Sequence, residues 1–146
     1  MYRQVEGRLQ VLLAHPGGPF WARKDQGAWL IPKGEYGADE DALTAAKREF
    51  FEELGIALQG ECRPLGEVKQ KSGKIVTAFA LAGDLDVGAV VPGTFEMEWP
   101  PKSGRRQSFP EVDRAAWFGA EEARRKIVPA QAAFIDRLLA IIPAKP

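Results

Sequence analysis

The stretch that decides the fold runs from Gly34 to Ile56 and reads GEYGADEDALTAAKREFFEELGI. From about Asp41 to Leu54 its apolar residues recur at the spacing of one helical face, which predicts an amphipathic helix. This face is expected to point inward and to consist of Leu43, Ala46, Phe50 and Leu54.

Both ends of the predicted helix carry their own signals. Asp39, Glu40 and Asp41 lie at its start, where the helix dipole favours negative charge. Gly55 follows the last periodic residue, and glycine readily adopts the left-handed conformation that ends many helices. The stretch therefore predicts a helix with defined ends.

Three carboxylates share one face of this helix. Glu49, Glu52 and Glu53 stand at positions i, i+3 and i+4, where each like-charge pair costs roughly 0.2–0.5 kcal/mol. They also crowd the C-terminal end, where the dipole disfavours anions, and Arg48 relieves only part of the repulsion. A bound cation explains this arrangement, and hard oxygen ligands suit Mg2+ or Mn2+. The alternative is a solvated acidic face.

The complete spacing of the stretch decides between these interpretations. It reads as G, five residues, E, seven residues, R-E-apolar, one residue, E-E, one residue, G-apolar, for which chance agreement is on the order of 10⁻⁹ per starting position. This pattern is similar to the Nudix box, so the chain resembles Nudix hydrolases, with the box at residues 34–56. The matching positions are Gly34, Glu40, Arg48, Glu49, Phe50, Glu52, Glu53, Gly55 and Ile56.

Composition bounds the class of protein. The 146 residues suit a single domain spanning 1–146, and 45% apolar with 27% charged residues is typical of a soluble globular protein. Twenty basic residues balance twenty acidic ones, so nucleic acid is an unlikely partner and no membrane is expected. The single cysteine, Cys62, excludes an internal disulfide and, with no signal sequence, favours a cytoplasmic location.

The rest of the chain predicts an α/β fold. A hairpin is expected around residues 70–73, with its second strand covered on both faces, and residues 102–108 are expected to form a mobile loop over a site. Further strands are expected at 8–14, 29–32, 63–69, 74–82 and 94–99 and within 111–118, and C-terminal helices at 119–127 and 129–142.

The resemblance implies a Nudix α/β/α sandwich, in which a mixed β-sheet lies between the box helix and the C-terminal helices. Many family members begin with a longer first strand than Met1 and Tyr2 supply, so this strand is expected to be short or built differently. The implied activity is pyrophosphohydrolysis of a nucleoside diphosphate linked to another group, with Mg2+ as cofactor and Mn2+ as a substitute. Glu49, Glu52 and Glu53 would hold the metal, and Glu49 would be the general base.

The resemblance also assigns accessory roles. Arg48 would orient the carboxylates, and Glu40 would support the metal site. A backbone carbonyl of Lys33 or Gly34 would reach a metal, while Gly34 and Gly55 would be structural.

A further carboxylate is expected outside the box. Several Nudix enzymes carry one that faces the box helix, and Glu111 is the residue of this chain in the corresponding place. Glu96 and Glu98 are alternatives, and an exposed loop position is the competing interpretation of Glu111.

Aromatic and basic residues interleave before the box. Either Phe20, Trp21 and Trp29 are core anchors, or one of these aromatic residues stacks a base. In the second case Arg23 or Lys24 would contact phosphate. The only histidine, His15, has no neighbouring cluster of ligands and is expected to be structural or to border the site.

The small-molecule substrate is expected to be a nucleotide. The Pro32-Lys33-Gly34 sequence before the box is similar to that of diadenosine-polyphosphate hydrolases, and Lys33 would add a charge for a polyphosphate. Further charges could come from the flanking loops, through Arg23, Lys24, Arg105 and Arg106. This favours a dinucleoside polyphosphate as the substrate. An NTP, the kind of substrate that MutT-like enzymes cleave, is the second candidate. A hydrolase for nucleotide sugars or capped RNA, or a Nudix-like module that binds a nucleotide without hydrolysis, are the alternatives.

Overall fold

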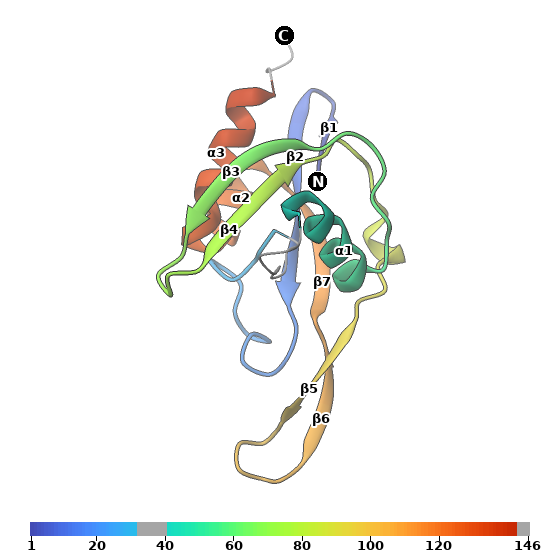
Figure 1. The fold of residues 1–146 in the computed structure, drawn as a ribbon, viewed down its shortest axis with the longest axis vertical. Helices are drawn as coiled ribbons and strands as arrows, with labels where there is room; N and C mark the ends of the chain where they lie inside the picture. The colour runs from blue at the N-terminus through green and yellow to red at the C-terminus, as the bar shows by residue number, and fades with distance from the viewer. Residues whose placement is uncertain (32–40, 143–146) are drawn as a thin grey trace.

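A three-stranded antiparallel sheet forms the centre of the protein in the computed structural model, which describes residues 1–31 and 41–142. Its strands are β1 (Tyr2–Val5), β2 (Arg8–Pro16) and β7 (Val112–Gly119), in the order β1-β2-β7 (Figure 1). The first strand is therefore present, with four residues paired to β2. Residues 11–15 of β2 are all buried, which means that both faces of this strand are covered.

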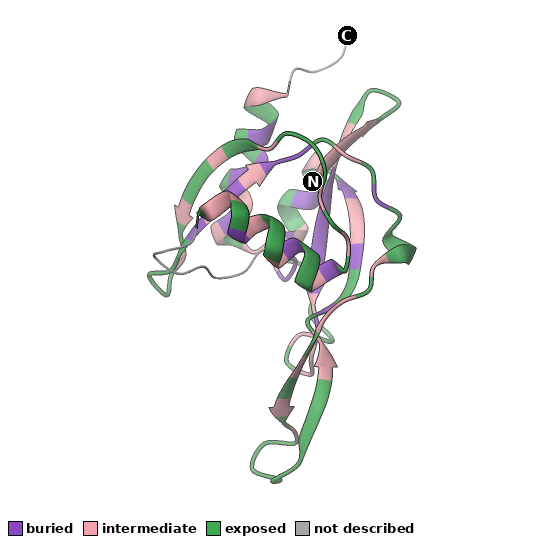
Figure 2. Ribbon diagram, turned by 45° about the vertical axis from the view of Figure 1, so that its right-hand side comes forward, coloured by how far each residue is buried: buried purple, intermediate pink, exposed green. Residues whose placement is uncertain are grey.

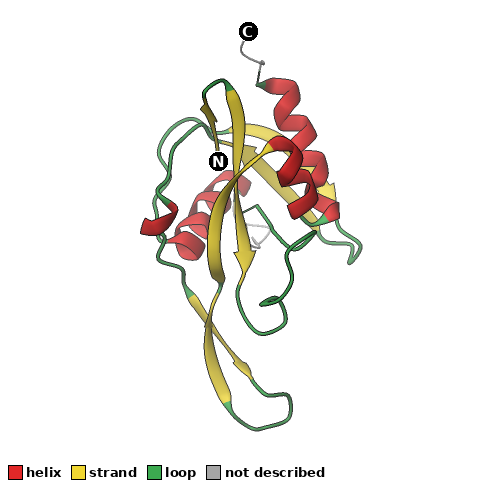
Figure 3. Cartoon of the chain, turned by 180° about the vertical axis from the view of Figure 1, so that it is seen from behind, coloured by secondary structure: helices red, strands yellow, loops and turns green. Residues whose placement is uncertain are grey.

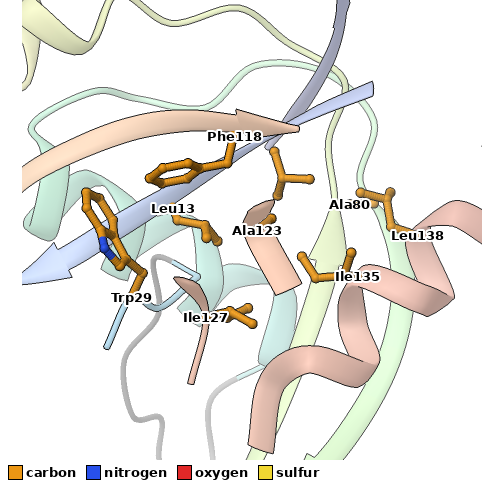
Figure 4. Close-up of a cluster of buried hydrophobic side chains, with 9 residues drawn as sticks. Leu13, Trp29, Ala80, Phe118, Ala123, Ile127, Ile135 and Leu138 are labelled. Carbon is orange, nitrogen blue, oxygen red and sulfur yellow. The ribbon is translucent and has the colours of Figure 1, made fainter. Parts of the chain in front are cut away.

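Helices cover the two faces of this sheet. On one face α1 (Ala42–Leu54) packs Phe50 and Leu54 against Leu12. On the other face the buried cluster contains Leu13 together with residues of α2 (Ala120–Lys126) and α3 (Ala132–Ile141) (Figure 4). Because successive residues of β2 point to opposite faces, one strand serves both layers. The predicted α/β/α sandwich is confirmed.

The caps of α1 follow the sequence signals. Asp41 caps the N-terminus by accepting a hydrogen bond from the Thr44 amide, and Gly55 ends the helix with φ of 73°. The inward face is shifted slightly from the prediction. Phe50 and Leu54 are buried as expected, but the third buried residue is Ala45, whereas Leu43 and Ala46 are only half-buried.

The remaining strands form two separate hairpins rather than extensions of one mixed sheet. The first hairpin joins β3 (Arg63–Lys69) to β4 (Ile75–Ala80) at the predicted turn. In the described residues, parallel pairing is limited to isolated bridges, such as the one between Tyr2 and Ala82. The predicted strand at 29–32 is likewise reduced, within the described part, to bridges at Trp29 and Leu30.

The prediction that the second strand of this hairpin is covered on both faces is wrong. One face of β4 is buried through Val76, Ala78 and Ala80, and it packs on Phe134 of α3. The opposite face includes Ile75, which is exposed. The difference arises because α3 covers only one side of the hairpin.

The second hairpin extends from the body of the molecule (Figure 1). It pairs β5 (Thr94–Glu98) with β6 (Arg106–Pro110), and most of its residues are exposed (Figure 2). The expected mobile loop at 102–108 is therefore wrong in its second half, because residues 106–108 pair with β5.

Short helical turns lie in the connections between some of these elements (Figure 3). Two 3-10 turns, Val87–Ala89 and Pro129–Gln131, precede β5 and α3 respectively. No helix in the described residues is both long and apolar enough to cross a membrane.

Candidate active site

The carboxylates of α1 are organised by one arginine. The Arg48 Nη1 donates to Glu49 Oε1 at 2.9 Å and to Glu52 Oε1 at 3.2 Å. The Glu49 side chain is 16% exposed and that of Glu52 is 50% exposed, so Glu49 is the more sheltered of the two. Glu53 is half-buried on the same helix. Arg48 thus holds two carboxylates of the predicted set in place.

Glu111 lies directly before β7 and approaches the C-terminal end of α1, which carries these carboxylates. Its pKa lies above the usual value because the carboxyl group is partly buried and because Glu49 and Glu52 lie close to it. A Cβ atom on Gly93 would lie 2.8 Å from the carbonyl oxygen of Glu52 and 3.5 Å from Oε2 of Glu111, so the Glu111 carboxylate lies beside the end of α1 although the two are far apart in sequence. The expectation that Glu111 faces the box helix agrees with this position, and its role in metal binding stays a prediction.

Backbone hydrogen bonds hold Glu111 in this position. The Gly93 amide donates to the carbonyl oxygen of Glu52 at 3.0 Å, and the Glu111 amide donates to the carbonyl oxygen of Gly93 at 2.8 Å. On the other side, the Gly17 amide donates to the carbonyl oxygen of Glu111 at 3.0 Å. Gly93 therefore links the C-terminal turn of α1 directly to Glu111.

Close approach explains why glycine occupies two of these positions. A Cβ atom on Gly93 would lie 2.8 Å from the carbonyl oxygen of Glu52, and one on Gly17 would lie 1.9 Å from that of Pro110. Sequence reasoning missed both residues, since neither belongs to a recognisable motif. The only available signal was the glycine and proline content of the loops around them.

The aromatic residues before the box separate into two groups. Trp29 is 3% exposed and its indole Nε1 donates to Asp25, so the hypothesis that Trp29 stacks a base is wrong and the core interpretation holds. The ring is held there by edge contacts with His15 and Phe118. Trp21 is partly exposed, and the Lys24 Nζ lies 5.0 Å from the centre of its ring.

His15 is a buried structural residue that ties three segments together. Its Nδ1 lies 2.8 Å from a carboxylate oxygen of Asp113, and its Nε2 lies 2.6 Å from the carbonyl oxygen of Lys24. The side chain therefore anchors the loop that carries Arg23 and Lys24 to strands β2 and β7. Arg23 and Lys24 themselves are exposed on this loop.

Three residues that were given roles in the box or directly before it lie outside the described residues. These are Lys33, Gly34 and Glu40.

A cavity of about 470 Å3 lies beside α1. Its lining is mainly apolar and comes from the Leu43 and Phe50 side of the helix, the second strand of the β3–β4 hairpin and α3, with Lys47 and Lys74 among its polar members. Among the described residues that line it, none is a carboxylate. The cavity is thus distinct from the acidic face of α1.

The order of elements and the acidic face agree with one known family. Its model, the NUDIX domain, matches residues 3–138. The chain belongs to the Nudix family.

Solved structures show the same fold. The Nudix chain is similar to the ORF135 protein of E. coli, with 26% identity, a TM-score of 0.56, and coverage of 99% of this chain and 89% of that one. It is similar to an Ap4A hydrolase of C. elegans, at 21% identity and a TM-score of 0.62, over 95% and 91% of the two chains. The NUDIX domain of Shewanella oneidensis NrtR, solved with ADP ribose, matches at 15% identity and a TM-score of 0.60, over 94% and 80%. No curated protein matched the chain.

Nudix proteins are typically pyrophosphohydrolases for a nucleoside diphosphate linked to another group, and they generally use divalent metals. The donor set here fits such a metal chemically, because carboxylate oxygens suit Mg2+ and because Glu111 lies close to Glu49 and Glu52. In the described residues, however, no three acidic, histidine or cysteine side chains converge tightly enough to hold an ion as they stand. Arg48 binds Glu49 and Glu52 instead, so metal binding requires these side chains to adjust.

Proposed function

We propose that this Nudix protein hydrolyses a phosphoanhydride bond of a nucleoside polyphosphate with Mg2+, and that dinucleoside polyphosphates are preferred to NTPs. The observation that carries the proposal is the position of Glu111, which Gly93 joins to Glu52 by backbone hydrogen bonds, so that carboxylates from two separate elements come together and repel one another. A metal ion relieves this repulsion, and the same ion would neutralise phosphate oxygens and lower the pKa of the attacking water.

The proposed role of each active-site residue follows from its position. Glu49, Glu52, Glu53 and Glu111 supply oxygen ligands from α1 and from the start of β7. Glu49 is the general base in this proposal, because its carboxylate is more sheltered than that of Glu52 and so is better placed to accept a proton from water. Arg48 orients Glu49 and Glu52 through the hydrogen bonds described above.

The preference for a polyphosphate rests on charges near the site. His15 fixes the loop that carries Arg23 and Lys24 to the strand edge that leads to Glu111, so both cations belong to the same end of the molecule. Trp21 lies under Lys24 and offers an aromatic face on the same loop. Lys33, in the sequence before the box that is similar to that of diadenosine-polyphosphate hydrolases, would add a further charge.

A substrate panel tests the proposal. Purified protein with Mg2+ should cleave diadenosine tetraphosphate with a higher kcat/KM than ADP-ribose or a nucleotide sugar, and the products should be identified by chromatography. A preference for either of the latter substrates contradicts the substrate class but not the hydrolase. Binding of a nucleotide without any Mg2+-dependent cleavage would instead support a binding module.

A further inference from the structure

The hairpin formed by β5 and β6, called here the arm (residues 94–110), has two chemically different faces. Side chains alternate along each strand, and residues directly opposite each other point to the same face. Phe95 and Phe109 are opposite each other, and their rings lie 6.0 Å apart. Glu96 and Arg106 belong to the other face, where they form an ion pair at 3.6 Å. One face of the arm is therefore aromatic and the other is charged.

The loop at residues 17–24 packs against the aromatic face. Phe20 makes an edge contact with Trp99, with ring centres 5.4 Å apart. Gly18 lies so close to Phe95 that a Cβ atom would be 3.0 Å from the ring. Phe20 nevertheless remains 59% exposed, so the pair presents an aromatic surface to solvent.

Cations border this aromatic surface. The Trp99 amide donates to the carbonyl oxygen of Arg105, which continues the strand register and places Arg105 opposite Trp99. Arg23 and Lys24 are exposed on the adjoining loop, and Lys102 is exposed at the tip of the arm. Aromatic rings beside basic side chains are the chemistry that binds a base and its phosphates.

The arm begins at the candidate active site. Its first residue follows Gly93, which is hydrogen-bonded both to Glu52 of α1 and to Glu111. Trp99 lies six residues beyond Gly93, which corresponds to about 20 Å along an extended strand at about 3.3 Å per residue. A group bound at Trp99 is therefore too far away to be the nucleotide that is cleaved, but it can be the far end of an extended substrate.

We propose that the arm and the 17–24 loop bind the far nucleotide of a dinucleoside polyphosphate whose phosphoanhydride chain reaches the carboxylates of α1. The base stacks on Phe20, whose ring is held by its edge contact with Trp99, and Arg105 contacts the phosphate nearest to it. This inference rests on the proposed function. It explains why a substrate with two nucleosides would be preferred to one with a single nucleoside. An aromatic surface alone would also suit a second copy of the chain, but the bordering cations and the origin of the arm at Glu111 favour a polyphosphate.

Kinetics with two substrates test the assignment. In Arg105→Gln and in Phe20→Ala, the KM for diadenosine tetraphosphate should rise roughly tenfold, the scale of losing one stacking or charge contact to a base. The KM for ATP, which has one nucleoside, should not change, and neither should kcat for either substrate. Phe20 is exposed, so its removal should leave the melting temperature unchanged.

Arg106→Gln is the matched control, because it removes the same charge from the neighbouring residue on the opposite face of the arm. It should leave the KM for both substrates unchanged. Equal effects of Arg105→Gln and Arg106→Gln, or equal effects on ATP and diadenosine tetraphosphate, overturn the proposal. Light scattering tests the alternative that a second copy of the chain covers the aromatic surface. A wild-type dimer that dissociates in Phe20→Ala would also overturn the proposal.

Failure of the arm can be distinguished from failure of the proposed function. If wild-type protein cleaves ATP and diadenosine tetraphosphate but the arm variants have no effect, only the arm is excluded. If the wild-type protein cleaves neither substrate, the arm can still be tested by calorimetric binding of both nucleotides. The titrations use Ca2+, another ion that prefers oxygen ligands. Tighter binding of diadenosine tetraphosphate than of ATP that is lost in Arg105→Gln supports the arm, and equal affinities overturn it.

Discussion

The C-terminal turns of α1 and the arm meet at Gly93, yet they are held in opposite ways. The helix is fixed by buried side chains, Phe50 and Leu54, against the central sheet. The arm is held mainly by its own backbone pairing and by a few aromatic contacts with the 17–24 loop. The comparison indicates that the proposed catalytic carboxylates lie on the firmly packed region, whereas we expect substitutions in the arm to have little effect on folding.

The largest effect is expected from a substitution on α1 that removes a proposed metal ligand. Glu53→Gln should lower kcat by about 10³-fold or more, because a metal ligand and its charge are removed from the transition state. Stability without metal should stay the same or rise, since one like-charge pair on α1 is relieved. Steady-state kinetics and thermal unfolding of the same preparation measure both quantities. Near-normal turnover would remove Glu53 from the metal site.

Stability should separate the two regions clearly. Leu13→Ala, at a fully buried position of β2, should lower the free energy of unfolding by about 2–5 kcal/mol. Phe20→Ala, beside the arm, should change it by less than about 0.5 kcal/mol, as expected of exposed positions. Urea unfolding followed by circular dichroism compares the two variants. Similar losses would mean that the arm contributes to the core.

The junction between the regions should be sensitive to a single methyl group. Gly93→Ala places a Cβ atom 2.8 Å from the carbonyl oxygen of Glu52, so the hydrogen-bonded link to Glu111 must shift. We expect kcat to fall by about tenfold, on the scale of small displacements of catalytic groups, with a smaller change in melting temperature. Gly119→Ala is the control for glycine removal, because no atom lies within 4 Å of the position of its Cβ and its φ of −62° suits alanine. Equal kcat values in the two variants would show that the link does not position Glu111.

The smallest expected effect concerns pH. The pKa of Glu111 is raised in the folded protein by burial and by Glu49 and Glu52, so the folded state binds this proton more tightly than the unfolded state. Without metal, wild-type stability should therefore fall as pH rises from the ordinary glutamate value of 4.5 through the raised pKa. Glu111→Gln should flatten this dependence and be the more stable protein at neutral pH. Melting temperatures between about pH 4 and 8 test the sign; a steeper fall in the variant would contradict it.

Features set by neighbours in sequence were predictable, and those set by distant backbone were not. The caps of α1 and its acidic face depend on residues within a few positions of one another, so spacing alone indicated Asp41, Gly55 and the glutamates. The burial of Trp29 depends on Phe118, and no local pattern distinguishes a buried tryptophan from one that stacks a base.

The arm illustrates the same limit from another side. Residues 102–108 are polar and rich in turn formers, which is equally typical of a free loop and of the tip of an exposed hairpin. Only the pairing of Phe95 with Phe109, fourteen positions away, distinguishes the two. Glu111 was found from the family resemblance, whereas its support by Gly93 could be seen only in three dimensions.

The exposed arm also bears on solubility. Within the described residues β5 and β6 pair only with each other, so each has an outer backbone edge onto which another chain could add a strand and begin to aggregate. The arm has the features by which proteins prevent such association: both strands are short, they carry charged residues, and Pro100, Pro101 and Pro110 end their pairing. Its shape therefore keeps an aromatic surface available to solvent without making that surface a nucleus for edge-to-edge assembly.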